Sequence, residues 1–122
     1  MIYLIGSEKG GTGKTTLATH LAAMRALAGK EVLLVDTDKQ ASASAWATAR
    51  SLRRAQTGQR GDITCVMKRG LVGYDIARLA EKFDTVIVDA GGQDSVELRQ
   101  AIAVCDYLLI PVRPSQWDLW SL

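Results

Sequence analysis

The sequence is poor in cysteine and proline and has no long apolar run. Two cysteines, Cys65 and Cys105, are too few for a disulfide framework, so a reduced, cytoplasmic environment is the default expectation. Two prolines among 122 residues exclude a collagen-like chain. No apolar stretch approaches the roughly 18 residues of a membrane-spanning helix, so no membrane segment is expected. The first six residues also lack the basic residues of a secretory signal.

A strong charge imbalance is absent as well. The formal net charge is +2, which is too small to indicate a nucleic-acid-binding protein by itself. The sequence is 48% hydrophobic and 23% charged, and its length is close to the usual domain size of roughly 100–150 residues. We therefore expect a single domain over residues 1–122 with a core of its own.

Short apolar runs alternate with longer helical patterns along the chain. The apolar runs predict strands at residues 2–5, 31–36, 63–67, 85–89 and 107–112. The patterns between them predict helices at residues 13–28, 42–56, 72–83 and 95–104. Because the strands are apolar without alternation, they predict a parallel sheet with helices on both faces, which is an α/β fold.

Details of the helical patterns predict faces and ends. Leu17, Leu21 and Met24 recur at threes and fours in the first helix, and Gly29 is a natural stop after it. Ser95 is suited to cap the last helix. These assignments place a glycine-rich segment between the first strand and the first helix.

That segment reads Ser7-Glu8-Lys9-Gly10-Gly11-Thr12-Gly13-Lys14-Thr15-Thr16. Its glycines permit the backbone to approach a ligand closely, and successive N–H groups at a helix start form an anion site. A lysine adds a positive charge for the outer phosphates, and a hydroxyl can bind magnesium. The residues expected to bind nucleotide are Gly10, Gly11, Thr12, Gly13, Lys14, Thr15 and Thr16.

Aspartates stand where two other predicted strands end. Asp36 ends the second strand, Asp38 follows it, and Asp89 ends the fourth. Each one alone is better explained as a turn or capping residue. Ligands of parallel α/β sheets bind beyond the carboxyl ends of the strands, however, and the glycine-rich segment lies there too. Together the three positions therefore indicate a nucleotide site.

The glycine-rich segment resembles the deviant Walker A motif of the ParA/MinD family of ATPases. The match is K-G-G-x-G-K-T from Lys9 to Thr15, whereas the general phosphate-loop pattern fails at Glu8. The run Asp36-Thr37-Asp38-Lys39-Gln40 resembles the family's D-x-D-P-Q motif, with lysine in place of proline. Residues 85–92 resemble its Walker B segment, and residues 107–115 its fifth strand and V-x-P-S segment. The likeness is greatest to short plasmid-partition ATPases of the ParF type.

The resemblance implies a P-loop three-layer α/β/α fold with strand order 3-2-4-1-5, and Mg-ATP as the bound nucleotide. It implies catalytic roles for Lys9, Lys14 and Asp38, with Lys9 reaching the phosphates of a partner subunit and Asp38 acting on water. It also implies that Thr15, Asp36 and Asp89 serve the metal. Full members carry further strands and helices, so residues 1–122 are expected to form one incomplete ATPase domain.

The resemblance further implies a biological setting. An ATP-dependent homodimer, a centromere-binding partition protein and non-specific DNA are the expected partners. The expected output is partition of plasmid or chromosomal DNA, in the cytoplasm and on the nucleoid. The alternatives are a metabolic P-loop enzyme that phosphorylates a carboxylate, and a fragment that does not hydrolyse ATP.

The arginines of the second helix and the turn after it suit either a DNA-facing patch or a solvated face; they are Arg50, Arg53, Arg54 and Arg60.

Overall fold

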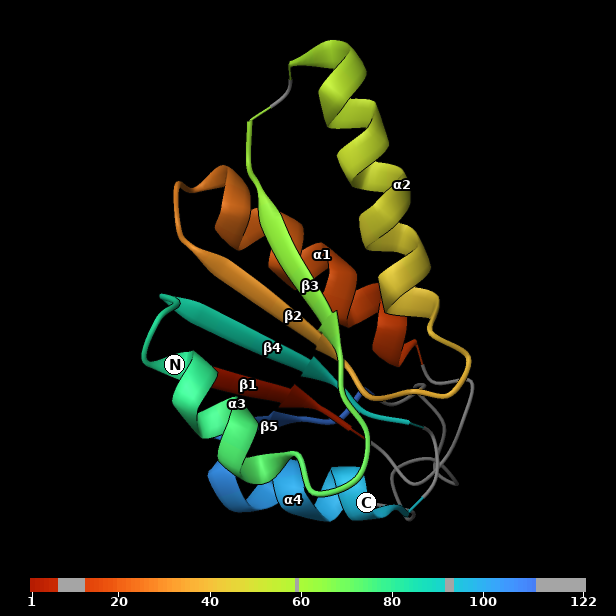
Figure 1. The fold of residues 1–122 in the computed structure, drawn as a ribbon, viewed down its shortest axis with the longest axis vertical. Helices are drawn as coiled ribbons and strands as arrows, with labels where there is room; N and C mark the ends of the chain where they lie inside the picture. Colours follow the sequence, from red (N-terminus) through yellow and green to blue (C-terminus); the bar gives the residue numbers. More distant parts are fainter. Residues whose placement is uncertain (7–12, 59, 92–93, 112–122) are drawn as a thin grey trace.

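A computed structural model of the protein describes residues 1–6, 13–58, 60–91 and 94–111. Within these residues, five strands alternate with four helices, and the strands form one sheet in the order β3-β2-β4-β1-β5 (Figure 1). The strands are β1 (Ile2–Ile5), β2 (Val32–Asp36), β3 (Ile63–Met67), β4 (Thr85–Asp89) and β5 (Tyr107–Leu109). The helices are α1 (Lys14–Leu27), α2 (Ser42–Thr57), α3 (Gly73–Ala80) and α4 (Val96–Val104). Every strand pairing is parallel, which confirms the predicted class and strand order.

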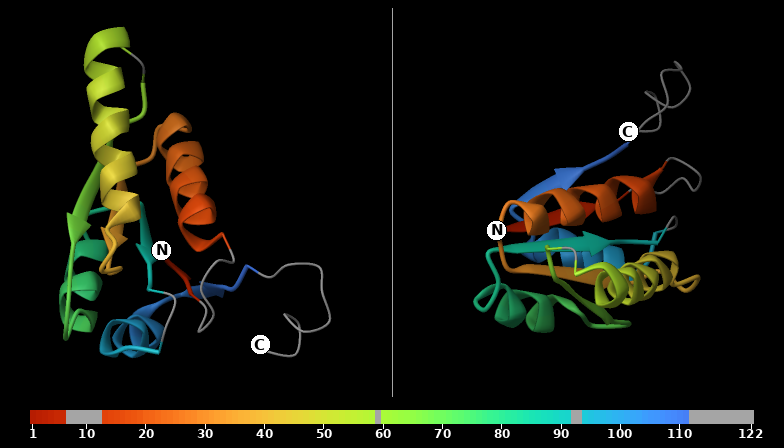
Figure 2. Two further views of the ribbon diagram at one scale, coloured as in Figure 1. Left: turned by 90° about the vertical axis from the view of Figure 1, so that its right-hand side faces the viewer. Right: turned by 90° about the horizontal axis from the view of Figure 1, so that it is seen from above.

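The molecule has three layers, with α1 and α2 on one face of the sheet and α3 and α4 on the other (Figures 1 and 2). Side chains of β2 alternate between the two core clusters. Leu33 and Val35 pack toward α3 and α4, while Val32 and Leu34 pack toward α1 and α2. Both faces of the central strands are therefore buried, as their unbroken apolar runs predict.

The face of α1 that packs on the sheet differs from the predicted one. Its buried positions include Ala18, Ala22 and Ala26, whereas Leu17 and Leu21 are only partly buried. Met24 is 67% exposed, so its assignment to the buried stripe is wrong. Small side chains let a helix backbone lie close to a sheet, and the alanine row fits that role better than the larger side chains.

The ends of the helices explain most of the remaining differences. After α1, the N–H groups of Gly29 and Lys30 donate to Ala26 and Arg25, with Gly29 at φ 86°, which confirms the predicted glycine stop. Helix α3 ends at Ala80, three residues before the predicted end. There the N–H groups of Glu81 and Lys82 donate to carbonyls three residues back, so the chain tightens into a turn.

The last helix and strand agree with prediction in part. Ser95 accepts a hydrogen bond from the Leu98 N–H, which confirms it as the cap of α4. Strand β5 is shorter than predicted and ends at Leu109. Tyr107 on this edge strand stacks on Tyr3 of β1, with ring centroids 5.3 Å apart.

Candidate nucleotide site

The carboxyl ends of β1, β2 and β4 meet at one edge of the sheet. In the strand register, Ile5 of β1 and Asp36 of β2 both lie beside Asp89 of β4. Asp36 and Asp89 have no exposed surface. Two buried carboxyl groups on adjacent strands are costly without partners or a cation, and such sites are candidates for function.

Helix α1 begins at this edge and contributes three candidate residues. Gly13 precedes the helix at φ 84°, a left-handed conformation that favours glycine. Lys14 is the first helical residue and is buried. Thr15 follows, and its hydroxyl donates to Oδ2 of Asp89 at 2.8 Å. The structure thus brings the phosphate-loop lysine and threonine to the aspartate that ends β4.

Asp89 carries a raised pKa. Burial is the main cause and raises the pKa to about 6, the Thr15 hydrogen bond opposes it, and the charges of Asp36 and Asp38 add to it. Its Oδ1 is buried and has no hydrogen-bond partner among the described residues. An unpaired carboxylate oxygen in this position is suited to a cation or to a water bound to one.

The residues present fit a magnesium ion. Mg²⁺ prefers oxygen ligands and is usually bound by one or two carboxylates together with substrate phosphates and water. The Thr15 hydroxyl and the unpaired oxygen of Asp89 are such ligands, and they lie beside the start of α1. The fit rests on the orphaned oxygen and on the chemistry of the donors.

Unlike Asp89, Asp36 accepts hydrogen bonds at both of its carboxylate oxygens. Its Oδ1 accepts the Asp38 N–H at 3.0 Å, and its Oδ2 accepts both the N–H and the hydroxyl of Ser44 at 2.9 Å. Ala41, the residue before α2, offers no capping side chain, so Asp36 performs that function from the neighbouring strand. Sequence reasoning missed this role of Asp36 and Ser44. The missing cap at Ala41 is the signal that could have suggested it.

Asp38 lies two residues after the end of β2, at the same edge of the sheet, and is partly exposed. Its Oδ1 accepts the N–H of Gln40 at 3.1 Å. Thr37, just before it, donates its N–H and its hydroxyl to the carbonyl oxygen of Asp89, each at 3.1 Å. These bonds tie the segment after β2 to the end of β4, so Asp38 is held close to Asp89, which its charge influences.

Other predicted site residues are less informative. Lys9, Gly10, Gly11 and Thr12 lie outside the described residues. Thr16 is exposed in the first turn of α1, and its carbonyl accepts bonds from the side chains of Thr19 and His20.

Arg50 and Arg54, two of the four arginines considered for a DNA-facing patch, have partners among the described residues. Arg50 is buried and donates from Nη1 to the carbonyl of Gly61, and its guanidinium lies 6.0 Å from the centroid of the Trp46 ring. Arg54 forms an ion pair with Asp62 at 3.0 Å. These contacts hold the Gly61–Asp62 segment against α2, which projects beyond the sheet (Figure 1). The contacts of Arg50 and Arg54 do not support a DNA-facing patch that uses all four arginines.

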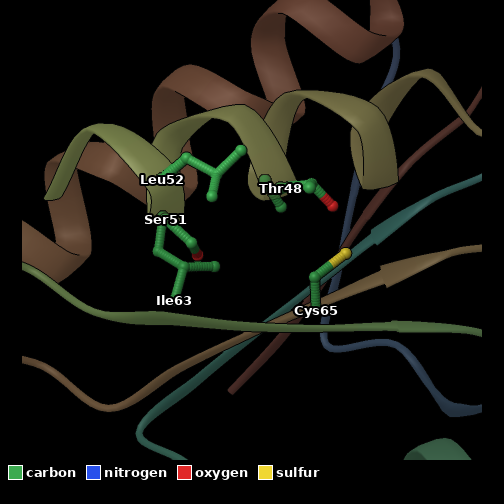
Figure 3. A pocket seen from close by; sticks show the side chains of 6 residues that line it. Thr48, Ser51, Leu52, Ile63 and Cys65 are labelled. Carbon is green, nitrogen blue, oxygen red and sulfur yellow. The ribbon is translucent and has the colours of Figure 1, made fainter. Parts of the chain in front are cut away.

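A hollow of about 330 Å³, separate from the candidate nucleotide site, lies between α2 and the edge strand β3 (Figure 3). It is lined by Ala47, Thr48, Ser51, Leu52, Ile63 and Cys65. None of the predicted nucleotide-site residues lines it. We therefore do not assign the nucleotide to this hollow.

No helix in the described part of the chain is long and apolar enough to cross a membrane.

A parallel α/β sheet with this phosphate-loop helix and these strand-end aspartates defines a P-loop nucleotide-binding domain. The sequence matches the family described as "CobQ/CobB/MinD/ParA nucleotide binding domain" over residues 3–103. The chain therefore belongs to this family, and the predicted membership of the ParA/MinD ATPases is confirmed. The finer likeness to the ParF type stays a prediction.

Two curated relatives illustrate the similarity. Maintenance of carboxysome distribution protein A of Gloeobacter kilaueensis is 39% identical, and the match covers 97% of this chain and 51% of that protein. Protein ParA of Rhizobium radiobacter is 30% identical, with coverage of 96% and 50%. The chain thus spans about half the length of these relatives.

Three solved structures illustrate the similarity in fold. A plasmid partition protein from Borrelia burgdorferi matches with TM-score 0.77 at 20% identity, covering 98% of this chain and 69% of that one. The pNOB8 ParA bound to nonspecific DNA has TM-score 0.73 at 21% identity, with coverage of 98% and 56%. An ATP complex of a Cyanothece McdA variant has TM-score 0.75 at 19% identity, with coverage of 98% and 59%.

Proposed function

We propose that the protein binds and slowly hydrolyses Mg-ATP as a nucleotide-sandwich dimer and acts in the partition of plasmid or chromosomal DNA. The observation that carries the proposal is the contact of Thr15 with Asp89 at the carboxyl edge of the sheet, beside the start of α1. Family membership supports it, and a plasmid partition protein from Borrelia burgdorferi shares the fold. The carboxysome distribution and ParA relatives do not favour a carboxylate-phosphorylating metabolic enzyme.

In the proposed site, Lys14 and the N–H groups at the start of α1 bind the phosphates. Thr15 and Asp89 would hold the magnesium ion, and Asp36 would support that end of the site. The ion would supply positive charge to the β- and γ-phosphates. Lys9 of each subunit would reach the phosphates held by the other. The site thus acts by positioning and by charge neutralisation.

In the hydrolytic step, Asp38 orients a water molecule and accepts its proton. The water oxygen forms a bond to the γ-phosphorus as the bond from that phosphorus to the bridging oxygen breaks. ADP leaves with the bridging oxygen, and phosphate is released. The partly exposed position of Asp38 beside Asp89 supports this role, because a water must enter there.

The proposed partners are DNA and a second partition protein. The pNOB8 ParA is bound to nonspecific DNA in its solved structure, and we propose that the ATP-bound dimer of this protein also binds DNA without sequence preference. A centromere-binding partition protein would stimulate hydrolysis. The proposed place of action is the cytoplasm, on the nucleoid.

Phosphate release from ATP tests the proposed roles. We expect Lys14→Ala and Asp38→Ala each to lower the hydrolysis rate by about 100-fold, since each removes charge or positioning at the reacting phosphate. Lys30→Ala and Glu31→Ala are matched controls, because both side chains are exposed and lie just before β2, at the opposite edge of the sheet, and their rates should stay unchanged. Normal rates in the Lys14 and Asp38 variants would contradict the assignment.

Sedimentation of the same proteins tests the dimer. Wild type should become dimeric with Mg-ATP, and Lys9→Ala should stay monomeric. Wild type that remains a monomer with and without nucleotide would argue against the sandwich arrangement.

A further inference from the structure

Ser44 is joined to the segment that carries Asp38 through one buried carboxylate. Ser44 is the third residue of α2 and donates both its N–H and its hydroxyl to Oδ2 of Asp36. The other oxygen of Asp36 accepts the Asp38 N–H at 3.0 Å. Asp36 has no exposed surface, so its orientation depends on these three bonds and on the packing around it.

Hydrogen bonds hold the Asp38 segment on both sides. On one side, Thr37 is bonded to the carbonyl oxygen of Asp89. On the other, the Asp38 carbonyl accepts the Ala41 N–H, and its carboxylate accepts the Gln40 N–H. Because Asp38 is itself partly exposed, packing alone does not fix its place. The bond from its N–H to Asp36 therefore matters for where its carboxylate points.

We propose that Ser44 is a positioning residue that holds Asp38 in place through the Asp36 carboxylate. This inference rests on the proposed function, in which Asp38 acts on the attacking water. Hydrogen bonds to a carboxylate are stronger than neutral ones, and the start of a helix favours a negative charge. Two donors from Ser44 at the start of α2 thus keep Asp36 in the orientation that receives the Asp38 N–H.

The surroundings of Ser44 show which substitutions are informative. Its hydroxyl lies 3.8 Å from Sγ of Cys65, which lines the hollow between α2 and β3 (Figure 3). A threonine at position 44 keeps the hydroxyl, whereas alanine removes it and leaves the N–H bond to Asp36. One turn later, the Thr48 hydroxyl donates to the Ser44 carbonyl and does not contact Asp36. Thr48→Ala is therefore the matched control for loss of a hydroxyl in α2.

Steady-state hydrolysis of Mg-ATP by the whole chain tests the proposal. In Ser44→Ala we expect kcat to fall about tenfold, because a small misplacement of a group that acts on the reacting water is costly. KM and the Kd for Mg-ATP should stay within about twofold, since phosphate binding does not involve Ser44. Ser44→Thr should restore kcat, and Thr48→Ala should leave it unchanged.

Hydrogen exchange at the Asp38 amide gives a second readout, independent of activity. Exchange should be about tenfold faster in Ser44→Ala, which corresponds to ~1.4 kcal/mol, and unchanged in Ser44→Thr and Thr48→Ala. The proposal is overturned by an unchanged kcat, by a loss that falls on KM alone, by failure of the threonine rescue, or by unchanged exchange. If wild type does not hydrolyse ATP, the proposed function fails, and the exchange rates alone decide whether Ser44 positions Asp38.

Discussion

At the scale of single residues, the buried Asp89 carboxylate destabilises the folded protein in the absence of a cation. It is fully buried, one of its oxygens has no partner among the described residues, and its pKa is raised to about 6, chiefly by burial. A carboxyl group with a raised pKa in the folded state destabilises that state when it ionises. The bound cation would relieve this cost, so stability and ligand binding are linked at this residue.

Asp89→Asn should therefore stabilise the nucleotide-free protein at neutral pH. The carboxyl group ionises near pH 3.8 in the unfolded chain and near pH 6 in the folded one, so its destabilising effect grows as the pH rises from 4 to 6 and is constant above that. One pKa unit corresponds to about 1.4 kcal/mol, which gives a gain of up to about 3 kcal/mol above pH 6 and little gain at pH 4.

Urea unfolding of Asp89→Asn and wild type at pH 4 and pH 7.5 measures this gain. Glu31→Gln, at an exposed glutamate just before β2, serves as the control and should change little at either pH. If Asp89→Asn is no more stable than wild type at pH 7.5, the ionised Asp89 carboxylate does not destabilise the folded protein, and this account of Asp89 is contradicted.

At the scale of elements, the start of α2 is unusual. Ala41, the residue before the helix, has φ 55°. Among the residues that the structure describes, it is the only non-glycine residue with a positive φ. The left-handed conformation costs an L-residue roughly 1–2 kcal/mol. Asp36 supplies the cap that Ala41 lacks, so the bond network of the site also stabilises the helix start.

Ala41→Gly should relieve this strain and raise the free energy of unfolding by about 1 kcal/mol, because glycine adopts positive φ freely. Ala45→Gly, at an exposed position inside α2, should instead lower it by about 1 kcal/mol through loss of helix propensity. Urea unfolding measures both. A destabilised Ala41→Gly would mean that the backbone at residue 41 is not strained.

The first, third and fourth strands were predictable to the residue, and the helices less well. β1, β3 and β4 have their predicted bounds because each is a short apolar run followed by polar or glycine residues. α3 ends early because its last carbonyls bond to a tighter turn, which apolar spacing does not reveal. The prediction that Met24 lies on the buried face of α1 is wrong. Apolar spacing favours large side chains as the buried ones, whereas the helix packs a row of alanines on the sheet.

At the scale of the whole molecule, parallel pairing and buried strands follow from the sequence pattern, and the strand order follows from the family resemblance. The meeting of Asp36 and Asp89 on adjacent strands also follows from that order, since both end strands at the same edge. The bond from Ser44 to Asp36 could not be foreseen, because it depends on how the chain turns between β2 and α2. The same holds for Arg50, whose partner Gly61 lies across a turn.

Calorimetric titration of the whole chain with ATP, in the presence and absence of Mg²⁺, tests the nucleotide site most directly. We expect saturable binding to one site per chain that is strengthened by Mg²⁺, and loss of that strengthening in Thr15→Ala. Lys30→Ala, with an exposed lysine away from the site, should bind as wild type does. Absence of any binding heat at millimolar ATP, with or without Mg²⁺, would contradict the account.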